Sequence, residues 1–505
     1  MERQLWLLWA ALAVPLLYCL TNLRRRLGTG RRPLPGPTPL PLIGNLLDLR
    51  RGNLHHTLAR LARTHGPVMY LRLGLTDAVV VSSRDAASEA FMRHDRRLAG
   101  RAIPDIARAL GFSERAINWL PSSDPHWKTL RGVLATHIFS SRALAAARGV
   151  RERKVRDLVS YFRARTGQEV YVGRAVYGAM LNLMSSIVFS VDVVADMDMD
   201  AAAGSTQGIR ELLNDLVSSA AKPNVSDLFP FLRPFDLQGW RRWTAKKLEK
   251  FYRFLDDMID RRLTEDSDSS SRDKHGDFLD VLIQLMSAGK LARGDITSLL
   301  FEVFASGTDA LVVTVEWTMA ELLRNPRVMA KVRAEIQGTL GSKEAIEESD
   351  VACLRYLMAV MKEAMRLHPV APLMLPHMAM EDGVEIQGHA VPKGHTVIFN
   401  TWAIMRDPAA WERPNEFIPE RFMDRPEMVF KGKEPEFSPF GSGLRLCPAQ
   451  PMAERVVPLG LASLLHAFEW RLPNGLLPDE FDLSERFNHT NVPAVPLKAV
   501  PFAIT

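Results

Sequence analysis

The stretch that decides the fold of this chain is a loop, Phe437-Ser-Pro-Phe440-Gly-Ser-Gly443-Leu-Arg445-Leu-Cys447-Pro-Ala449. Glycine and proline break it, and an apolar helical pattern follows directly. A Cys447 thiolate would therefore stand just before a helix N-terminus, where free N–H groups and the helix dipole favour negative charge. Arg445 adds a guanidinium two residues away, which can bind a carboxylate. The loop thus predicts a soft, anionic metal ligand beside a cation.

A lone cysteine is more often a buried structural residue than a ligand, so the neighbours of Cys447 decide between the two interpretations. The loop resembles the haem-binding signature of the cytochrome P-450 family at Phe440, Gly443, Arg445 and Cys447. Ala449 stands where the family usually has glycine. The resemblance implies haem b as the cofactor and Cys447 as the thiolate ligand of its iron. It also implies that Phe440, Gly443 and Arg445 bind the haem.

Length, charge and cysteine content narrow the class of protein. The 505 residues include 64 Lys plus Arg and 58 Asp plus Glu, a net charge of +6. Because the basic residues are spread along the chain, we expect no nucleic-acid partner, whereas an anionic membrane or an acidic protein suits this charge. Three widely spaced cysteines form no disulfide framework, so the folded part is expected to face a reducing compartment.

The amino terminus predicts a membrane anchor. Residues 5–23 carry no charge, and as a helix they would span about 28 Å, close to the thickness of a bilayer core. A cleaved signal peptide is the alternative, but no small-residue cleavage site follows. The arginines after the span place the body of the protein in the cytosol. We expect a transmembrane anchor at 1–23, a basic and proline-rich hinge at 24–46 and one catalytic domain at 47–505.

Beyond the hinge, the sequence is mostly helical. We expect a helix at 54–64, a hairpin of strands at 68–73 and 78–81, and an irregular loop at 100–120. Trp127 and Arg131 then share one face of a helix, so the indole N–H and the guanidinium can bind one anion. Ordinary packing with a salt bridge is the alternative. The family resemblance implies that both residues contact a haem propionate.

Two segments between helices carry weaker signals. Residues 222–239 contain three prolines and three phenylalanines, and they either touch the membrane surface or simply connect helices. This segment is similar to that of plant P-450s of the geraniol 8-hydroxylase and ferruginol synthase group. Residues 264–274, rich in acids and serines, are expected to form a solvated linker.

A long helix is expected at 295–323, because no proline interrupts this apolar stretch. The step Gly307-Thr308-Asp309 in its middle weakens helical hydrogen bonding, and a buried acid there needs a partner or a proton-transfer role. The resemblance implies that the family activates oxygen here with a threonine hydroxyl, whose place Ala310 takes in this chain. Either Thr308, Asp309 with water, or a substrate hydroxyl replaces that group, or oxygen activation is impaired.

Glu363 and Arg366 lie on one helix face and, with Arg421 in a later Pro-Glu-Arg-Phe motif, resemble the buried charge triad of the family. An exposed ion pair is the alternative. The spacing is a weak signal, since Glu321 and Arg324 match it too.

Further site residues rest on position within the resemblance. His377 stands where the family places an arginine or histidine on a propionate, although a histidine in an apolar run is normally just hydrogen-bonded. Residues 370–377 resemble a substrate-lining strand and residues 485–493 the last substrate loop. The implied substrate-lining residues are Ala305, Val370, Leu373, His489 and Asn491. The polar His489 and Asn491 suggest a polar group on the substrate.

The motifs occur in the family's order along essentially the whole chain, and they resemble a plant microsomal P-450. The resemblance implies a mainly α P-450 fold with a small β-rich lobe, in the endoplasmic reticulum membrane with a cytosolic catalytic domain. The implied function is a haem-thiolate monooxygenase that inserts one oxygen atom from O2 into a C–H bond of a small lipophilic substrate, a mono- or diterpenoid. Electrons would come from NADPH through NADPH–cytochrome P-450 reductase, docked on a basic face. The alternatives are a haem-thiolate isomerase or dehydratase, which does not need O2, and an impaired haem protein.

Overall fold

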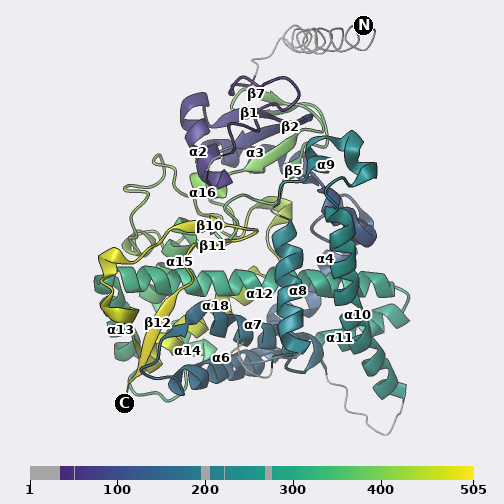
Figure 1. Cartoon of the computed structure of the whole chain (residues 1–505). Coiled ribbons are helices and arrows are strands. Elements are labelled where there is room, and N and C mark those ends of the chain that lie inside the picture. Colours follow the sequence, from purple (N-terminus) through teal and green to yellow (C-terminus); the bar gives the residue numbers. More distant parts are fainter. Residues whose placement is uncertain (1–33, 51, 195–204, 221, 268–275, 505) are drawn as a thin grey trace, which may run out of the picture.

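The computed structural model describes residues 34–50, 52–194, 205–220, 222–267 and 276–504. The predicted transmembrane anchor and the arginines of the hinge lie outside these residues. Helices dominate the described chain, and small β-sheets gather mainly in one lobe (Figure 1). This confirms the predicted mainly α fold with a small β-rich lobe.

The β-rich lobe is built on the predicted hairpin. Strands β1 (Val68–Leu73) and β2 (Thr76–Val81) pair antiparallel, and the parallel strand β8 (Thr396–Phe399) joins β2 from the distant second half of the chain. The sheet order is β1-β2-β8-β5-β3. The lobe is completed by α2 (Leu54–His65), α3 (Arg84–Leu98), β3 (Gly100–Arg101), β5 (His377–Met378) and the hairpin β6 (Val384–Ile386) and β7 (His389–Val391).

The helical body holds the largest apolar core, and two smaller cores lie in the lobe. Its helices are α4 (Pro125–His137), α5 (Ser141–Ala146), α6 (Arg148–Arg163), α7 (Val172–Phe189), α8 (Ser205–Ser219), α10 (Trp240–Ser267), α11 (Phe278–Ser287), α12 (Arg293–Arg324), α13 (Pro326–Leu340), α14 (Glu348–Val351), α15 (Arg355–Leu367), α17 (Glu420–Met423) and α18 (Gln450–Ala467). Two short helices, α9 (Val225–Leu228) and α16 (Thr401–Ile404), lie against the lobe. The remaining strands are β4 (Val170–Tyr171), β9 (Phe468–Arg471), β10 (Glu485–Phe487), β11 (Asn491–Pro493) and β12 (Lys498–Ala503).

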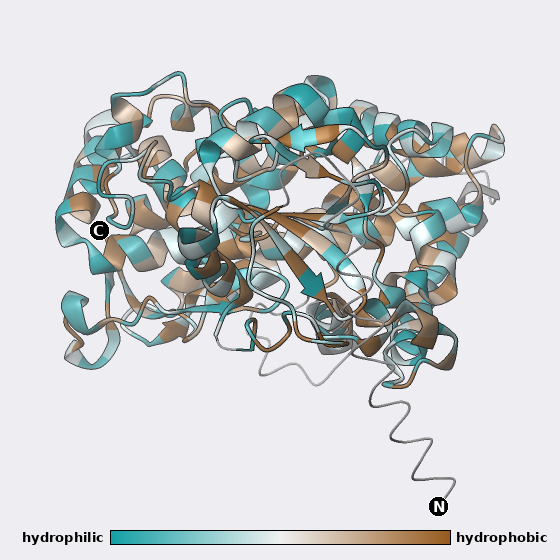
Figure 2. Cartoon of the chain, turned by 90° about the horizontal axis from the view of Figure 1, so that it is seen from above, coloured by the Kyte–Doolittle hydropathy of each residue, from teal (hydrophilic) through white to brown (hydrophobic). Residues whose placement is uncertain are grey.

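Hydrophobic residues concentrate on the central strands, while hydrophilic residues colour much of the outer helices (Figure 2). This distribution follows from the free energy gained when apolar surface leaves water.

The predicted long helix is α12, which crosses the helical body (Figure 1). Its bounds lie within two residues of the prediction, and Asn325 and Pro326 follow its end as expected. Helices α7, α10, α15 and α18 pack around it, so most of its residues are buried. Within the described residues, α7 and α12 are long and apolar enough to cross a membrane, but their burial identifies them as core helices.

Three segments differ from the sequence predictions. The loop at 100–120 contains β3 and a 3₁₀-helix, Asp105–Glu114, which is interrupted at residues 109–111. The linker predicted at 264–274 begins as helix, because α10 extends to Ser267; residues 268–275 are outside the described chain. The predicted substrate-lining strand at 370–377 is irregular up to residue 376, since its prolines remove backbone donors.

The described part of the hinge packs on the lobe. Tyr70 N donates to Pro35 O at 2.7 Å. Gly44 has a φ of +62°, and a Cβ at this position would lie 2.0 Å from Arg72 O. Glycine is therefore required for the close approach of the hinge to β1.

A buried ion-pair cluster ties α15 to the loop before the cysteine. Arg366 donates to both carboxylate oxygens of Glu363, at 2.8 and 2.9 Å, and Arg421 donates to Glu363 Oε1 at 3.0 Å. The second Glu-x-x-Arg pair is not an ion pair, because Glu321 contacts His368 and Arg324 donates to a backbone carbonyl. Only Glu363 and Arg366 are therefore joined in the described structure.

Replacing Glu363 by glutamine is expected to lower the free energy of unfolding by about 3–5 kcal/mol, because the buried Arg366 guanidinium loses its counter-charge. The measurement is a denaturant titration of the full-length protein in detergent, followed by tryptophan fluorescence. Glu249→Gln, which breaks the exposed pair with Arg253, is the matched control and should change stability by less than about 1 kcal/mol. Equal effects of the two variants would contradict the role of burial.

Candidate functional site

Cys447 lies three residues before α18, in a loop closed by its own backbone. Cys447 N donates to Phe440 O at 3.0 Å, and the backbone N–H groups of Ala449 and Gln450 bond the sulfur. Burial raises the pKa of the Cys447 thiol, while the N–H of Ala449, the charge of Arg131 and the N–H of Gln450 act in the opposite direction. The helix N-terminus therefore favours the thiolate, as the sequence predicts, in a site that water does not stabilise.

Gly443 has a specific structural reason in this loop. Its φ is +65°, and a Cβ there would lie 2.3 Å from Asp95 Oδ1 of α3. Asp95 Oδ2 accepts a hydrogen bond from Leu444 N at 2.9 Å. Glycine at position 443 thus lets the Asp95 carboxylate approach the loop and hold it. Phe440, in the same loop, makes an edge-to-face contact with Phe430, with 5.5 Å between the ring centroids.

Trp127 and Arg131 of α4 lie against the cysteine loop. Trp127 Nε1 donates to Ile117 O at 3.1 Å, and Arg131 donates to Leu446 O. Arg445 lies over the Trp127 ring, 5.1 Å from its centroid, and donates to three backbone carbonyls at 2.6–3.0 Å. The predicted cations are therefore gathered at one place and bound by backbone carbonyls.

Arg101 is a further buried cation that the sequence analysis missed. It donates to Leu375 O at 2.6 Å and Asn118 O at 3.2 Å. Burial and the like charges of Arg445 and Arg131 lower its pKa to about 9. In the same way, burial and the charge of Arg131 lower the pKa of Arg445 to about 10, against the charge of Glu302.

His377 pairs with Arg101 across β3 and β5. This pairing places it beside the cationic cluster, which consists of Arg101, Arg131 and Arg445. Its Nδ1 lies 2.8 Å from Leu98 O. Burial and the charge of Arg101 lower its pKa to about 3, although the hydrogen bond to Leu98 opposes this shift. The His377 side chain is therefore neutral. In the sequence, only its position within the family resemblance pointed to it.

The cationic cluster tests whether this site fits a haem. Within the described residues, Arg101, Arg131 and Arg445 form no ion pair, although all three are largely removed from water. Cations that are removed from water and lack an ion-pair partner call for anions. A thiol ligand beside three such cations fits a haem, which offers iron to sulfur and two carboxylates to the arginines.

Glu302 of α12 is the second residue that the sequence analysis missed. Its carboxylate accepts hydrogen bonds from Ile117 N at 2.8 Å and Asn118 N at 2.9 Å. Glu302 therefore holds the loop whose Ile117 carbonyl accepts hydrogen bonds from Trp127 and Arg445. Burial raises its pKa to about 7, against those hydrogen bonds. No sequence motif marks it, because its partners are nearly two hundred residues away.

Part of α12 is open in an otherwise buried helix. Residues 305, 307, 309 and 310 are partly accessible and Ser306 is exposed, whereas the flanking turns are buried. Thr308 is buried, and no described residue bonds its hydroxyl. Asp309 Oδ2 lies 2.7 Å from His489 Nε2, at the tip of the β10–β11 hairpin. The predicted acid therefore has a partner, and Ala310 offers only a methyl group beside it.

The other predicted lining residues take different positions. Asn491 is fully buried: its backbone N donates to Val370 O at 2.9 Å and its backbone O accepts from Trp317 Nε1. No described residue bonds the Asn491 side-chain amide. Leu373 packs on the core between α2 and the lobe sheet, while Ala305 packs partly exposed on the helical core. Ala305 and His489 are thus the predicted lining residues nearest the open part of α12.

Comparison with known proteins bears on the whole chain. The family profile described as Cytochrome P450 matches residues 34–494. The chain is 62% identical over 511 residues to cytochrome P450 76M5 of Oryza sativa subsp. japonica, with 99% of each chain covered. Oryzalexin D synthase and ent-cassadiene C11-alpha-hydroxylase 1 of the same organism are 57% and 56% identical over 504 residues, covering 100% of this chain and 99% of each relative.

These alignments cover 99–100% of this chain, and they confirm the plant P-450 predicted from the motifs. The chain therefore belongs to the cytochrome P450 family and is a monooxygenase that uses haem iron.

Proposed function

We propose that this monooxygenase inserts one oxygen atom from O2 into a C–H bond of a terpenoid, and that diterpenoids are the first class to test. The observation that carries this proposal is the full-length similarity to oryzalexin D synthase and ent-cassadiene C11-alpha-hydroxylase 1. The open part of α12, with Ala305 and Ala310, supports a bulky apolar substrate, because small side chains leave room beside the helix. His489 adds a polar group to this surface through its contact with Asp309.

The residues of the site divide into two sets by what they do. Cys447 would bind the iron through its sulfur, and Arg101, Arg131 and Arg445 would hold the haem carboxylates. Trp127 would position Arg445, which lies over its ring. When bound, the haem supplies the oxidant that attacks the C–H bond. Asp309 forms a hydrogen bond with His489, and a proton can be shared along this bond. The bond lies beside the proposed substrate space, where the reaction consumes protons.

A membrane position is part of the proposal, with an anchor at residues 1–23 in the endoplasmic reticulum. The segment after α9 supports it, because Phe231, Phe235 and Leu237 are 63–65% exposed. Leu75 N donates to Leu228 O at 2.8 Å, which ties this segment to the β1–β2 hairpin, the strand pair on which the hinge packs. Exposed aromatic side chains on the side of the hinge suit the interface of a bilayer.

The electron source is proposed to be NADPH through NADPH–cytochrome P-450 reductase. Lys431 and Lys433 are exposed on either side of Gly432. A Cβ at Gly432 would lie 2.3 Å from Gly441 O, so this segment packs directly on the cysteine loop. Two exposed cations beside the loop support the docking of an acidic reductase there.

The experiment is a substrate screen in microsomes that contain the reductase, with diterpene olefins and alcohols and with monoterpene alcohols. The expected product is one oxygen atom heavier than its substrate, and its formation requires NADPH and O2. Product without reductase or O2 would establish the isomerase or dehydratase instead. NADPH consumption without product from any substrate would establish an impaired haem protein.

Ala310→Thr is expected to raise coupling, the ratio of product to NADPH consumed, because the hydroxyl restores a proton donor beside Asp309. Ala310→Val is the matched control, since it has the shape of threonine without the hydroxyl. Coupling should rise in the first variant and not in the second. Equal coupling in both variants and in the wild type would show that protons follow another path.

That other path is expected to use His489. His489→Gln keeps a hydrogen-bond donor for Asp309 but cannot exchange a proton readily, so coupling should fall and peroxide per NADPH should rise. His466→Gln, on α18 with a bond to Gly341 O, is the control and should leave coupling unchanged. Adding Ala310→Thr to His489→Gln should restore coupling. Unchanged coupling in His489→Gln alone would exclude this contact from proton supply.

Arg101→Leu is expected to weaken haem retention about tenfold or more, because a charge-assisted hydrogen bond to a carboxylate contributes about 1.5–3 kcal/mol. The measurement is the rate at which haem transfers from the enzyme to apomyoglobin. Arg97→Leu, which removes an exposed arginine near Glu381, is the matched control. Similar transfer rates in the two variants would remove Arg101 from the haem site.

A further inference from the structure

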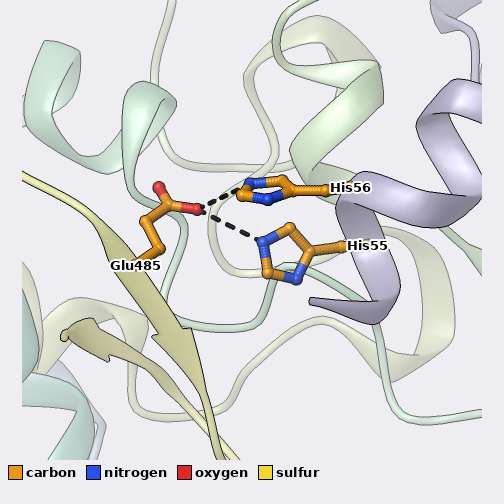
Figure 3. A group of neighbouring side chains, drawn as sticks. All are labelled: His55, His56 and Glu485. Carbon is orange, nitrogen blue, oxygen red and sulfur yellow. Dashed lines mark hydrogen bonds and ion pairs between the residues drawn. The ribbon is translucent and has the colours of Figure 1, made fainter. Parts of the chain in front are cut away.

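Two consecutive histidines at the start of α2 converge on one carboxylate of the β10–β11 hairpin (Figure 3). His55 Nε2 and His56 Nε2 lie 3.2 and 3.1 Å from the same oxygen, Glu485 Oε2. Consecutive residues on a helix normally point about 100° apart, so this convergence at the first turn is a specific arrangement. The three atoms all lie within 4.8 Å of one another.

We propose that His55, His56 and Glu485 form a binding site for a divalent metal ion of the zinc class, which links α2 to the β10–β11 hairpin. A tetrahedral zinc ion with bonds of about 2.0–2.1 Å separates its ligand atoms by about 3.3 Å. The two distances to Glu485 Oε2 are close to this separation, so small rotations of the imidazoles admit the ion. Two histidines and one carboxylate are a common zinc ligand set.

Groups behind the cluster orient Glu485. Its other oxygen, Oε1, lies 2.9 Å from His368 Nδ1 and 3.8 Å from Arg406 Nη2. Asn53 fixes the backbone, because its side chain donates to Glu485 O at 2.8 Å. Oε2 is thus left to the two histidines, and such hydrogen bonds behind a ligand position metal ligands in proteins.

The site is reachable from solvent, and its position gives the ion a structural role. The His56 side chain is 41% exposed, so an ion can enter beside it and keep a water as fourth ligand. The hairpin that carries Glu485 also carries His489 to Asp309 of α12. An ion at this site would fix the base of the hairpin whose tip contacts the catalytic helix.

The test uses the full-length haem-loaded protein in detergent, purified without a histidine tag and treated with a chelator. Zinc is then titrated in competition with a chromophoric chelator, in the absence of substrate and NADPH. The wild type is expected to bind one equivalent, and zinc is expected to raise its melting temperature. His56→Gln removes one of three ligands while keeping a donor for Glu485, and it should lower zinc affinity at least tenfold and abolish the rise in melting temperature.

His65→Gln is the matched control, because it removes a histidine from the other end of α2. It should bind zinc like the wild type. Two results would overturn the proposal: no zinc binding by the wild type at micromolar concentrations, or equal affinity of the wild type and His56→Gln, which would assign the ion to other residues. Because no turnover is measured, this outcome is independent of the substrate class proposed above.

Discussion

A half-buried cysteine beside three guanidinium groups that are largely removed from water is the constraint on which the rest of the structure depends. Burial alone disfavours both the thiolate of Cys447 and the charges of the arginines around it. The fold offsets this cost locally, with the N-terminus of α18 at the sulfur and backbone carbonyls at the guanidiniums. A bound haem would offset it further, since it offers iron to the sulfur and carboxylates to the arginines.

Two carboxylates, Glu363 and Glu485, hold together the segments that surround the cysteine and the arginines. Glu363 binds Arg366 and Arg421 and so fixes the chain that leads to the cysteine loop. Glu485 binds His368, and His368 in turn lies 2.7 Å from Glu321 of α12. Burial opposes protonation of His368, yet these two carboxylates raise its pKa. Glu485 therefore links three elements by polar contacts as well as by packing: the lobe helix α2, the β10–β11 hairpin and the long helix α12.

Much of this could be predicted from the sequence, because the signals were local. The apolar stretch of α12 without proline, the two strands of the β1–β2 hairpin and the loop around Cys447 each lie within a few tens of residues. Arg101 and Glu302 could not be found in this way. Their roles depend on contacts with residues 185 to 274 positions away in the chain, for which a single sequence has no pattern.

The sequence by itself determined the family, and it predicted the iron ligand and the missing hydroxyl at Ala310, because each is a matter of residue type at a fixed spacing. Only the tertiary structure decided which charges meet. It brought His489 to Asp309 across 180 positions and two histidines of α2 to Glu485 across some 430. Such pairs form because a compact chain must satisfy its buried polar groups with whatever partners packing brings near, and packing is a property of the whole fold.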